Sequence, residues 1–261
     1  MILVLAGTSE SREIVADLQN NGWELLVSVV TEYGVELIAE PGLEVLQGSL
    51  ERKSLVELIA ARQIDIIIDA THPFAAEISR LAIQAAAETE AVYLRFEREN
   101  IDFSRFADRE GIYQVKGYKE AACQSAKLAD IWERILLTIG SQRLEYFIEE
   151  IENWQKRLVV RFLPVRRFFR DLERQGFSPR NLIGMQGPCS KEMNRAILMD
   201  YEISVLVTKA SGSSGGLPAK IEAARELNIP VVLIERPKID YPRVFHNCQK
   251  LMEEVSKIQE D

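Results

Sequence analysis

Short runs of apolar residues recur along the whole chain, and each is followed by small polar residues and then by a stretch with helical spacing. A run such as Ile2–Ala6 is apolar at every position, which is typical of a strand buried on both faces of a sheet. Amphipathic helices between such strands supply the layers that cover a parallel sheet. The alternation therefore predicts an α/β protein built on doubly wound parallel sheets.

The alternation occurs in two series with a break between them. Residues 1–96 hold the first series, residues 97–111 are polar, aromatic-spiked and aperiodic, and residues 112–240 hold the second. The sequence therefore predicts two Rossmann-like domains joined by the connection 97–111. Residues 241–261 end the chain with an amphipathic helix, Phe245–Ile258, which could pack on either domain.

The element boundaries follow from the same pattern. The predicted strands are Ile2–Ala6, Leu25–Val30, Glu44–Gln47, Ile64–Asp69, Val92–Arg95, Ile112–Val115, Ile135–Ile139, Leu158–Leu163, Leu182–Met185, Val205–Thr208 and Val231–Ile234. The helices between them include one over Gln142–Asn153. Ligands of open α/β sheets bind beyond the carboxyl ends of the strands, so we expect a cleft between two facing sheet edges.

Composition narrows the class of protein. A formal net charge of −8 argues against general nucleic-acid binding, which needs a basic face. No apolar run approaches the roughly 18–20 residues that cross a bilayer, and the start MILVLAG is typical of a strand rather than a signal peptide. The three widely spaced cysteines and two histidines favour a reduced compartment and no metal site. We therefore expect a cytoplasmic protein, a monomer or small homo-oligomer, that binds neither nucleic acid nor membranes.

The strongest ligand signal lies in residues 203–220. An apolar run ends at Thr208 and gives way to Lys209-Ala210-Ser211-Gly212, then Gly215-Gly216 and an alanine-rich helix. A strand, a small polar loop and a helix together present backbone N–H groups to an anion. The loop predicts a phosphate or carboxylate site, and its alternative is a flexible solvent loop.

A second loop of this kind, Gly7-Thr8-Ser9-Glu10, follows the first strand and opens a helix. The pyrophosphate of a dinucleotide usually lies at this position. The full G-x-G-x-x-G pattern is absent, because Ser9 and Arg12 stand where glycines are expected. Thr8 and Ser9 also suit a helix cap.

Residues after the second strand bear on the choice of cofactor. Glu32 lies where an acid takes a ribose 2′-hydroxyl, which would favour NADH. Arg12, Arg52 and Lys53 are near in sequence and could hold the 2′-phosphate of NADPH instead. A helix-capping role for Glu32 is an equal alternative, so the choice stays open.

His72 ends the fourth strand and precedes a proline-started helix, so it could donate a proton or a hydrogen bond to a ligand, or cap nearby backbone. Arginines gather at positions 157, 161, 166, 167, 170 and 174, with Arg143 nearby. In an acidic protein this cluster favours a polycarboxylate or phosphate partner, although exposed charge runs are often only solvated. Arg161, inside an apolar strand, is the least surface-like of them. Because nucleophile-elbow, Walker and CxxC motifs are absent, a reaction whose chemistry is carried by a bound cofactor fits best.

Taken together, these motifs resemble the precorrin-6A reductase family, NAD(P)H-dependent enzymes of corrin-ring (vitamin B12) biosynthesis. The residues that carry the resemblance are Leu5-Ala6-Gly7-Thr8-Ser9-Glu10, Asp69-Ala70-Thr71-His72-Pro73-Phe74-Ala75, Tyr93-Leu94-Arg95-Phe96-Glu97-Arg98, Leu137-Thr138-Ile139-Gly140-Ser141-Gln142, Arg161-Phe162-Leu163-Pro164, Met185-Gln186-Gly187-Pro188-Cys189-Ser190, Val207-Thr208-Lys209-Ala210-Ser211-Gly212 with Gly215-Gly216, and Glu235-Arg236-Pro237. They span nearly the whole chain in the family's order. Ala6, Cys189 and Ala210 depart from the family's common residues, and Ala210, where glutamate is common, puts a charge role there in doubt.

The resemblance implies a nicotinamide cofactor, NADPH with NADH as the alternative, and a tetrapyrrole-derived macrocycle with many carboxylate arms, both held in the cleft. It implies a two-electron reduction of one ring double bond, with a proton from His72, Glu10 or solvent. The expected cofactor-binding residues are Gly7, Thr8, Ser9, Thr31, Gly48, Thr71, Gly140, Ser141, Lys209, Ser211, Gly212, Gly215 and Gly216. The expected substrate-binding residues are Arg143, Arg161, Arg166 and Ser190.

Our hypothesis is that the Gly7–Glu10 loop and the Thr208–Gly216 loop clasp the cofactor from opposite sides. Two alternatives from other classes remain at this stage: a nucleotide-sugar-dependent transferase and a non-catalytic nucleotide sensor. The sequence also leaves open whether the macrocycle contains cobalt.

Overall fold

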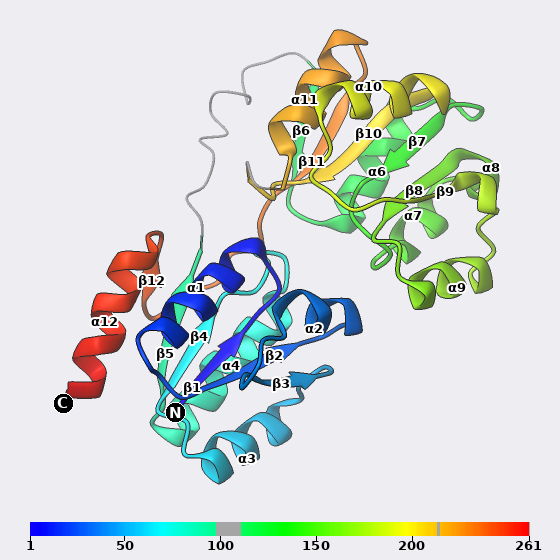
Figure 1. Ribbon diagram of the computed structural model, residues 1–261. Helices are drawn as coiled ribbons and strands as arrows, with labels where there is room; N and C mark the ends of the chain where they lie inside the picture. Colours follow the sequence, from blue (N-terminus) through cyan, green and yellow to red (C-terminus); the bar gives the residue numbers. More distant parts are fainter. Residues whose placement is uncertain (98–110, 213–214, 261) are drawn as a thin grey trace. The chain divides into compact units, whose positions relative to one another are not determined.

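The computed structural model describes residues 1–97, 111–212 and 215–260 of the chain (Figure 1). The chain divides into two compact units, Met1–Glu99 with Lys238–Asp261, and Asn100–Pro237. Each unit carries one six-stranded sheet, and every strand pairing in both sheets is parallel among the described residues. The predicted pair of parallel-sheet α/β halves is therefore confirmed. Most of the predicted connection 97–111 lies outside the described residues, and the cleft between the domains stays a prediction.

The first sheet has the strand order β12-β5-β4-β1-β2-β3. Its strands are β1 (Ile2–Leu5), β2 (Leu25–Val29), β3 (Glu44–Gln47), β4 (Ile66–Asp69), β5 (Val92–Phe96) and β12 (Val244–Phe245). Its helices are α1 (Ser9–Asn20), α2 (Glu32–Ile38), α3 (Arg52–Arg62), α4 (Ala76–Thr89) and α12 (Cys248–Glu260). With β12 as the sixth strand, this is the 3-2-1-4-5-6 order of dinucleotide-binding sheets, and the direction of winding reverses between β1 and β4.

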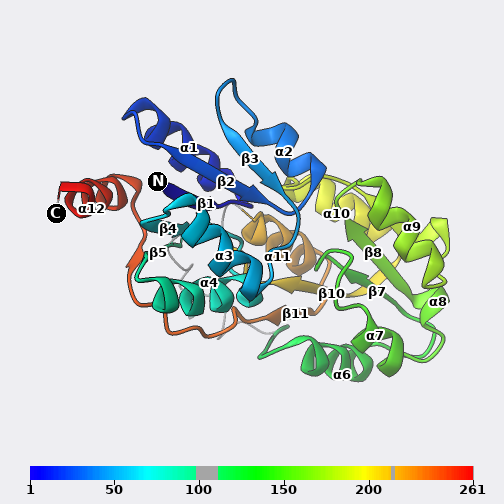
Figure 2. The same cartoon turned by 90° about the horizontal axis from the view of Figure 1, so that it is seen from below.

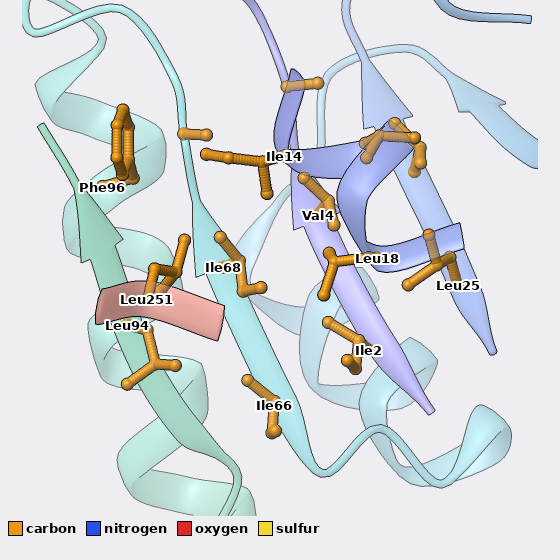
Figure 3. Close-up of a cluster of buried hydrophobic side chains, with 14 of the residues drawn as sticks. Ile2, Val4, Ile14, Leu18, Leu25, Ile66, Ile68, Leu94, Phe96 and Leu251 are labelled. Carbon is orange, nitrogen blue, oxygen red and sulfur yellow. The ribbon is translucent and has the colours of Figure 1, made fainter. Parts of the chain in front are cut away.

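Alternate residues of β1 enter two different cores, because successive side chains of a strand point to opposite faces. Ile2 and Val4 pack with Leu18 of α1 and Leu251 of α12 on one face (Figure 3). Leu3 lies on the other face, in a second core shared with α3 and α4. The C-terminal helix α12 therefore belongs to the first unit, which resolves the alternative that the sequence left open.

The second sheet has the order β6-β11-β10-β7-β8-β9. Its strands are β6 (Ile112–Val115), β7 (Arg134–Leu137), β8 (Leu158–Phe162), β9 (Leu182–Gly184), β10 (Ile203–Lys209) and β11 (Val231–Ile234). Its helices are α6 (Tyr118–Leu128), α7 (Glu145–Glu150), α8 (Trp154–Arg157), α9 (Arg166–Arg174), η1 (Pro179–Asn181), α10 (Lys191–Asp200) and α11 (Leu217–Glu226). Figure 2 shows α10 and α11 on one face of this sheet and α6 and α7 on the other.

Counted from β7, the second sheet repeats the winding order of the first. The sequence β9-β8-β7-β10-β11-β6 again reads 3-2-1-4-5-6, with β6 in the sixth place. The sixth strand comes from the end of the chain in the first sheet and from the start of the unit in the second. The winding of the second sheet therefore reverses between β7 and β10, which is where its ligand site is expected.

Two predicted helices are wrong in extent. The C-terminal helix begins at Cys248 rather than Phe245, because Val244–Phe245 pair with Arg95 and Phe96 as a strand. A two-residue strand has no periodicity that a sequence can reveal. The helix predicted over Gln142–Asn153 spans only Glu145–Glu150, and a left-handed Asn153 at φ 55° separates it from α8. Among the described residues, none of the helices is both long and apolar enough to cross a lipid bilayer.

Candidate active site

The loop after β1 begins α1 and is held closed by Ser11. Thr8 is the N-cap residue, and its hydroxyl accepts a hydrogen bond from Ser11 N at 3.1 Å. The Ser11 hydroxyl accepts hydrogen bonds from Gly7 N and Thr8 N, both at 3.2 Å. The Thr8 hydroxyl also donates to Ala70 O at 3.1 Å, which ties this loop to the one after β4. The two loops at the point where the winding reverses are therefore joined.

Gly7 leaves room beside the second loop. A β-carbon placed on Gly7 would come no closer than 3.9 Å to His72 N and 4.0 Å to Thr71 Cα. Neither contact requires glycine at this position for packing, because both are ordinary van der Waals distances. Gly7 is exposed and directly precedes Thr8, the N-cap residue at the positive end of α1.

A fully buried ion pair supports the loop after β4. Asp69 ends β4 and Arg95 lies in the adjacent strand β5, and their Oδ1 and Nη1 atoms are 2.7 Å apart at zero exposure. Tyr93 donates its hydroxyl to Asp69 Oδ2 at 2.6 Å. Burial alone would lower the pKa of Arg95, but the charge of Asp69, with smaller contributions from Tyr241 and Glu97, raises it instead. Both oxygens of the Asp69 carboxylate thus have donors, and the charge of Asp69 offsets the cost of burying Arg95.

This ion pair also fixes Thr71. Thr71 donates its hydroxyl to Asp69 Oδ1 at 2.6 Å, and its carbonyl accepts from Arg95 Nη2 at 3.1 Å. Thr71 was expected to bind the cofactor, and the structure places it at the expected edge with its hydroxyl committed to Asp69. A small hollow at this edge is lined by Thr8, Glu10, Ala70, Thr71, Pro73, Arg95, Phe96 and Glu97.

His72 and Glu10, the two candidates for the proton donor, lie on the two joined loops. His72 is half-buried, and its Nδ1 accepts a hydrogen bond from Phe74 N at 3.2 Å. With Nδ1 accepting, the ring's proton lies on Nε2, which makes Nε2 a donor. Glu10 is half-buried in the first turn of α1 and accepts from the Ser9 hydroxyl at 2.9 Å. Both residues are where the sequence predicts a site.

The loops after β2 and β3 complete this edge of the first sheet. Thr31 caps α2, and its hydroxyl accepts from Gly34 N at 3.0 Å. Gly48 donates its N–H to Val29 O at 2.9 Å and has φ 132°, a conformation open mainly to glycine. Val30, which directly follows β2 and precedes Thr31, is 66% exposed.

The charged residues weighed for cofactor choice have different surroundings. Arg52 pairs with Glu88 on α4, and Lys53 with Glu57 at 3.8 Å. Arg12 is exposed on α1 and forms no ion pair with the described residues. Of the three cations, Arg12 is the one available to a phosphate beyond β1.

In the second unit the glycine loop after β10 is closely packed. Ser211 is buried, and a β-carbon on Gly215 would lie 2.2 Å from its Oγ, so only glycine fits there. Gly212 and Gly216 have φ 83° and 68°, and Gly216 caps α11 while packing against Pro188. Lys209 ends β10, and burial lowers its pKa to about 8. The described part of the loop is thus closely packed, and the choice between an anion site and a flexible solvent loop stays a prediction.

Two further cations are buried at the same edge of the second sheet. Arg161 of β8 is 8% exposed and donates from Nη1 to Asn194 Oδ1 at 2.8 Å. Lys220 of α11 is 7% exposed and donates from Nζ to Gly215 O at 3.0 Å. Burial lowers the pKa of Arg161 and lowers that of Lys220 to about 7, with Arg161 and Lys209 adding to the effect on Lys220. Both groups are held by neutral partners.

The remaining expected residues follow the strands on either side of β8. Gly140 and Ser141 come after β7, and Gly140 has φ 90°. Arg143 follows them, exposed and left-handed at φ 65°. Arg166, also exposed, opens α9 just beyond β8, and Ser190 caps α10 by accepting from Met193 N at 3.1 Å. The substrate residues predicted from sequence thus follow three adjacent strands, β7, β8 and β9.

Comparison with known proteins shows the family to which this chain belongs. The family described as precorrin-6x reductase CbiJ/CobK matches residues 1–256. The chain belongs to this family. A cobalt-precorrin-6A reductase of Methanothermobacter thermautotrophicus is 36% identical to it, over 100% of this chain and 85% of the relative. One from Priestia megaterium is 35% identical, over 97% of this chain and 96% of the relative. A solved structure named CobK precorrin-6A reductase superposes with a TM-score of 0.74 at 25% identity, covering 98% of this chain and 96% of that one.

Membership of the precorrin-6x reductase family confirms the resemblance drawn from the motifs. The protein is a precorrin-6A or cobalt-precorrin-6A reductase, an oxidoreductase of cobalamin biosynthesis. This assignment argues against the two alternatives left by the sequence, a nucleotide-sugar transferase and a nucleotide sensor.

Sequence reasoning missed three supports of the reductase site. Ser11 follows Thr8 at the three-residue spacing of a capping box, a signal that was present in the sequence. Asp69 and Arg95 end neighbouring apolar strands, where a charge needs a partner. Leu217, Lys220 and Ile221 follow the helical spacing of a buried face, so Lys220 could have been recognised as a lysine turned inward.

Proposed function

We propose that this reductase transfers a hydride from NADPH to cobalt-precorrin-6A and that the dinucleotide binds over Gly7. The observation that carries the proposal is the open glycine where the winding of the first sheet reverses. The substrate comes from the family and from the two relatives named above, both of which are called cobalt-precorrin-6A reductases.

Binding uses groups that the first unit already positions. The positive end of α1 lies at Gly7 and Thr8, which suits the negative charge of a pyrophosphate. Ser11 and the Asp69–Arg95 pair hold the two loops from below, so the loops need little reordering when the dinucleotide binds. Val30 provides an apolar surface beyond β2 for the adenine.

The choice of NADPH over NADH follows from Arg12. A guanidinium with no ion pair among the described side chains can bind the 2′-phosphate bidentately. Arg52 and Lys53 already have carboxylate partners, and Glu32 lies in the first turn of α2.

The bound cofactor supplies the hydride, and the protein supplies orientation and a proton. One carbon of the ring double bond accepts the hydride, and its neighbour accepts a proton, so that the product gains two hydrogens and the cofactor is oxidised. The Nε2–H of His72 is the proposed proton donor, with Glu10 and solvent as alternatives.

The test is an anaerobic reaction with NADPH deuterated at the transferring position of the nicotinamide. We expect NADPH absorbance to fall only when cobalt-precorrin-6A is added, and one deuterium to appear in the macrocycle. Deuterium lost to solvent, or no oxidation of NADPH in the presence of the macrocycle, would contradict direct hydride transfer.

A further inference from the structure

The second unit buries positive charge without acidic partners. Arg161 and Lys220 come from different elements, β8 and α11, and each is more than nine-tenths buried. Within the described part of the chain, neither forms an ion pair, and their hydrogen-bond acceptors are a side-chain amide and a backbone carbonyl. Burying an unpaired charge is costly, so such residues need a reason to be there.

A continuous set of contacts joins the two cations. Asn194, which accepts from Arg161, donates to Cys189 O at 3.1 Å and to Ser190 O at 2.7 Å. Pro188, which precedes Cys189, packs against Gly216. A β-carbon placed on Gly216 would lie 3.1 Å from the Cβ of Pro188. Gly216 directly follows Gly215, whose carbonyl oxygen accepts the hydrogen bond from Lys220 Nζ. Arg161 and Lys220 are thus held by one framework made of the loops after β9 and β10.

The charges that act on Lys220 have mostly the same sign. Arg161 on β8 and Lys209 at the end of β10 both lower its pKa, and the thiol of Cys189, in the loop after β9, is the one group that raises it. Burial makes the largest contribution, bringing the pKa to about 7. An anion placed among these groups would relieve the repulsion and favour the charged lysine.

We propose that Arg161 and Lys220 form a receptor for one oxyanion of a bound ligand. The inference rests on the proposed function, which assigns the phosphates of the dinucleotide to α1 and Arg12 and so leaves a carboxylate arm of the macrocycle as the oxyanion; a dinucleotide phosphate is the other source, which the experiment separates. A guanidinium pairs bidentately with either group, and an ammonium adds donors from a second direction. Ser190 Oγ and the end of β10, with Lys209, lie on the same framework.

The experiment compares Arg161→Met and Lys220→Met with Lys127→Met, which removes an exposed lysine of the same unit. Three quantities are measured for each: the KM for cobalt-precorrin-6A at saturating NADPH, the Kd for NADPH by fluorescence, and the rise in melting temperature caused by inorganic sulfate. Sulfate stays fully ionised across the pH range of the experiment, and its effect on melting can be measured without the macrocycle and without NADPH.

A rise of about tenfold or more in KM alone assigns the receptor to a carboxylate arm, and a rise of that size in Kd alone assigns it to a phosphate. A smaller sulfate shift in both variants than in Lys127→Met supports the receptor even if NADPH turnover fails, so a failed proposed function remains distinguishable. Variants that match Lys127→Met in all three quantities would overturn the receptor.

Two checks protect this result against loss of folding. The variants must keep a cooperative melting transition, and Lys220→Arg keeps the positive charge if Lys220→Met does not fold. In the unchanged protein the sulfate shift should weaken as the pH rises above about 7, where Lys220 loses its proton. In Lys220→Arg that weakening should be absent, and a weakening that persists there would count against Lys220 as the anion's partner.

Discussion

The two sheets have the same winding order, but they treat buried charge in opposite ways. In the first unit Arg95 is fully buried and meets Asp69 Oδ1 at 2.7 Å; Thr71 donates to the same oxygen and Tyr93 to Oδ2. In the second unit Arg161 and Lys220 are almost as deeply buried but meet only neutral acceptors. A charge that is neutralised inside the fold supports the fold. A charge that is left without a counterion is suited to a ligand that brings one.

The largest expected effect is on stability, when the buried Arg95 loses its partner Asp69. Asp69→Asn keeps the shape of the side chain but leaves Arg95 charged and buried, so we expect a loss of about 3–5 kcal/mol in the free energy of unfolding. Urea unfolding measures it. Glu57→Gln, which breaks the exposed pair with Lys53, serves as the control and should change stability by about 0.5 kcal/mol or less. If Asp69→Asn lost no more stability than Glu57→Gln, the Asp69–Arg95 pair would not support the fold.

The cost of burying Lys220 should appear as a pH dependence of the free energy of unfolding. The folded pKa of Lys220, about 7, lies below its ordinary value of 10.5, so the unfolded chain binds more protons between these values. Stability contributed by this group therefore rises with pH across that window, by up to about 1.4 kcal/mol per pH unit. In Lys220→Met this contribution is absent. Urea midpoints taken between about pH 7 and pH 9 should therefore rise more steeply with pH for the unchanged protein than for Lys220→Met, and parallel curves would show that Lys220 is not perturbed.

The cofactor site of the first unit is tested by Gly7→Ala. Because the nearest atoms to the new methyl group are 3.9 Å away or more, we expect normal stability. The Kd for NADPH should rise about tenfold or more, because the methyl group occupies the space where the dinucleotide meets the backbone. Gly117→Ala is the matched control, since a β-carbon there meets nothing within 4 Å and its φ of −170° suits any residue. Equal affinities in the two variants would place the dinucleotide elsewhere.

The smallest expected effect concerns the choice of coenzyme. Arg12→Ala should weaken NADPH binding by about three- to tenfold and leave NADH binding unchanged, because only NADPH carries the 2′-phosphate. Fluorescence titration of both nucleotides gives the ratio. If both affinities fall together, Arg12 acts on a part of the dinucleotide that the two coenzymes share.

The sequence predicted the layered fold because its signal is local and repeated. Fully apolar runs such as Ile2–Leu5 and Val231–Ile234 can be recognised without knowledge of their partners. What the sequence could not supply depends on distant pairing. The strand Val244–Phe245 exists only because Arg95 and Phe96 lie beside it. Phe96 is 149 residues before its partner Phe245 in the chain.

The candidate site shows the same division. The loops after the strands were predicted from the rule that ligands bind at carboxyl ends, and Gly7, His72 and Lys209 lie at such ends. The partners of the charged residues could not be predicted in this way. Arg95 and Arg161 are both arginines within apolar strands, yet one has a buried carboxylate partner and the other an amide. That difference is set by which neighbouring strand or helix packs against each of them.

The most direct measurement compares the melting temperatures of Asp69→Asn and Lys220→Met without any ligand, at about pH 6, where Lys220 carries its charge. We expect Asp69→Asn to melt well below the unchanged protein and Lys220→Met to melt at or above it, because only the second change relieves an uncompensated charge. If Lys220→Met melted as low as Asp69→Asn, the lysine would be part of the fold's own support, and the contrast between the two edges would be wrong.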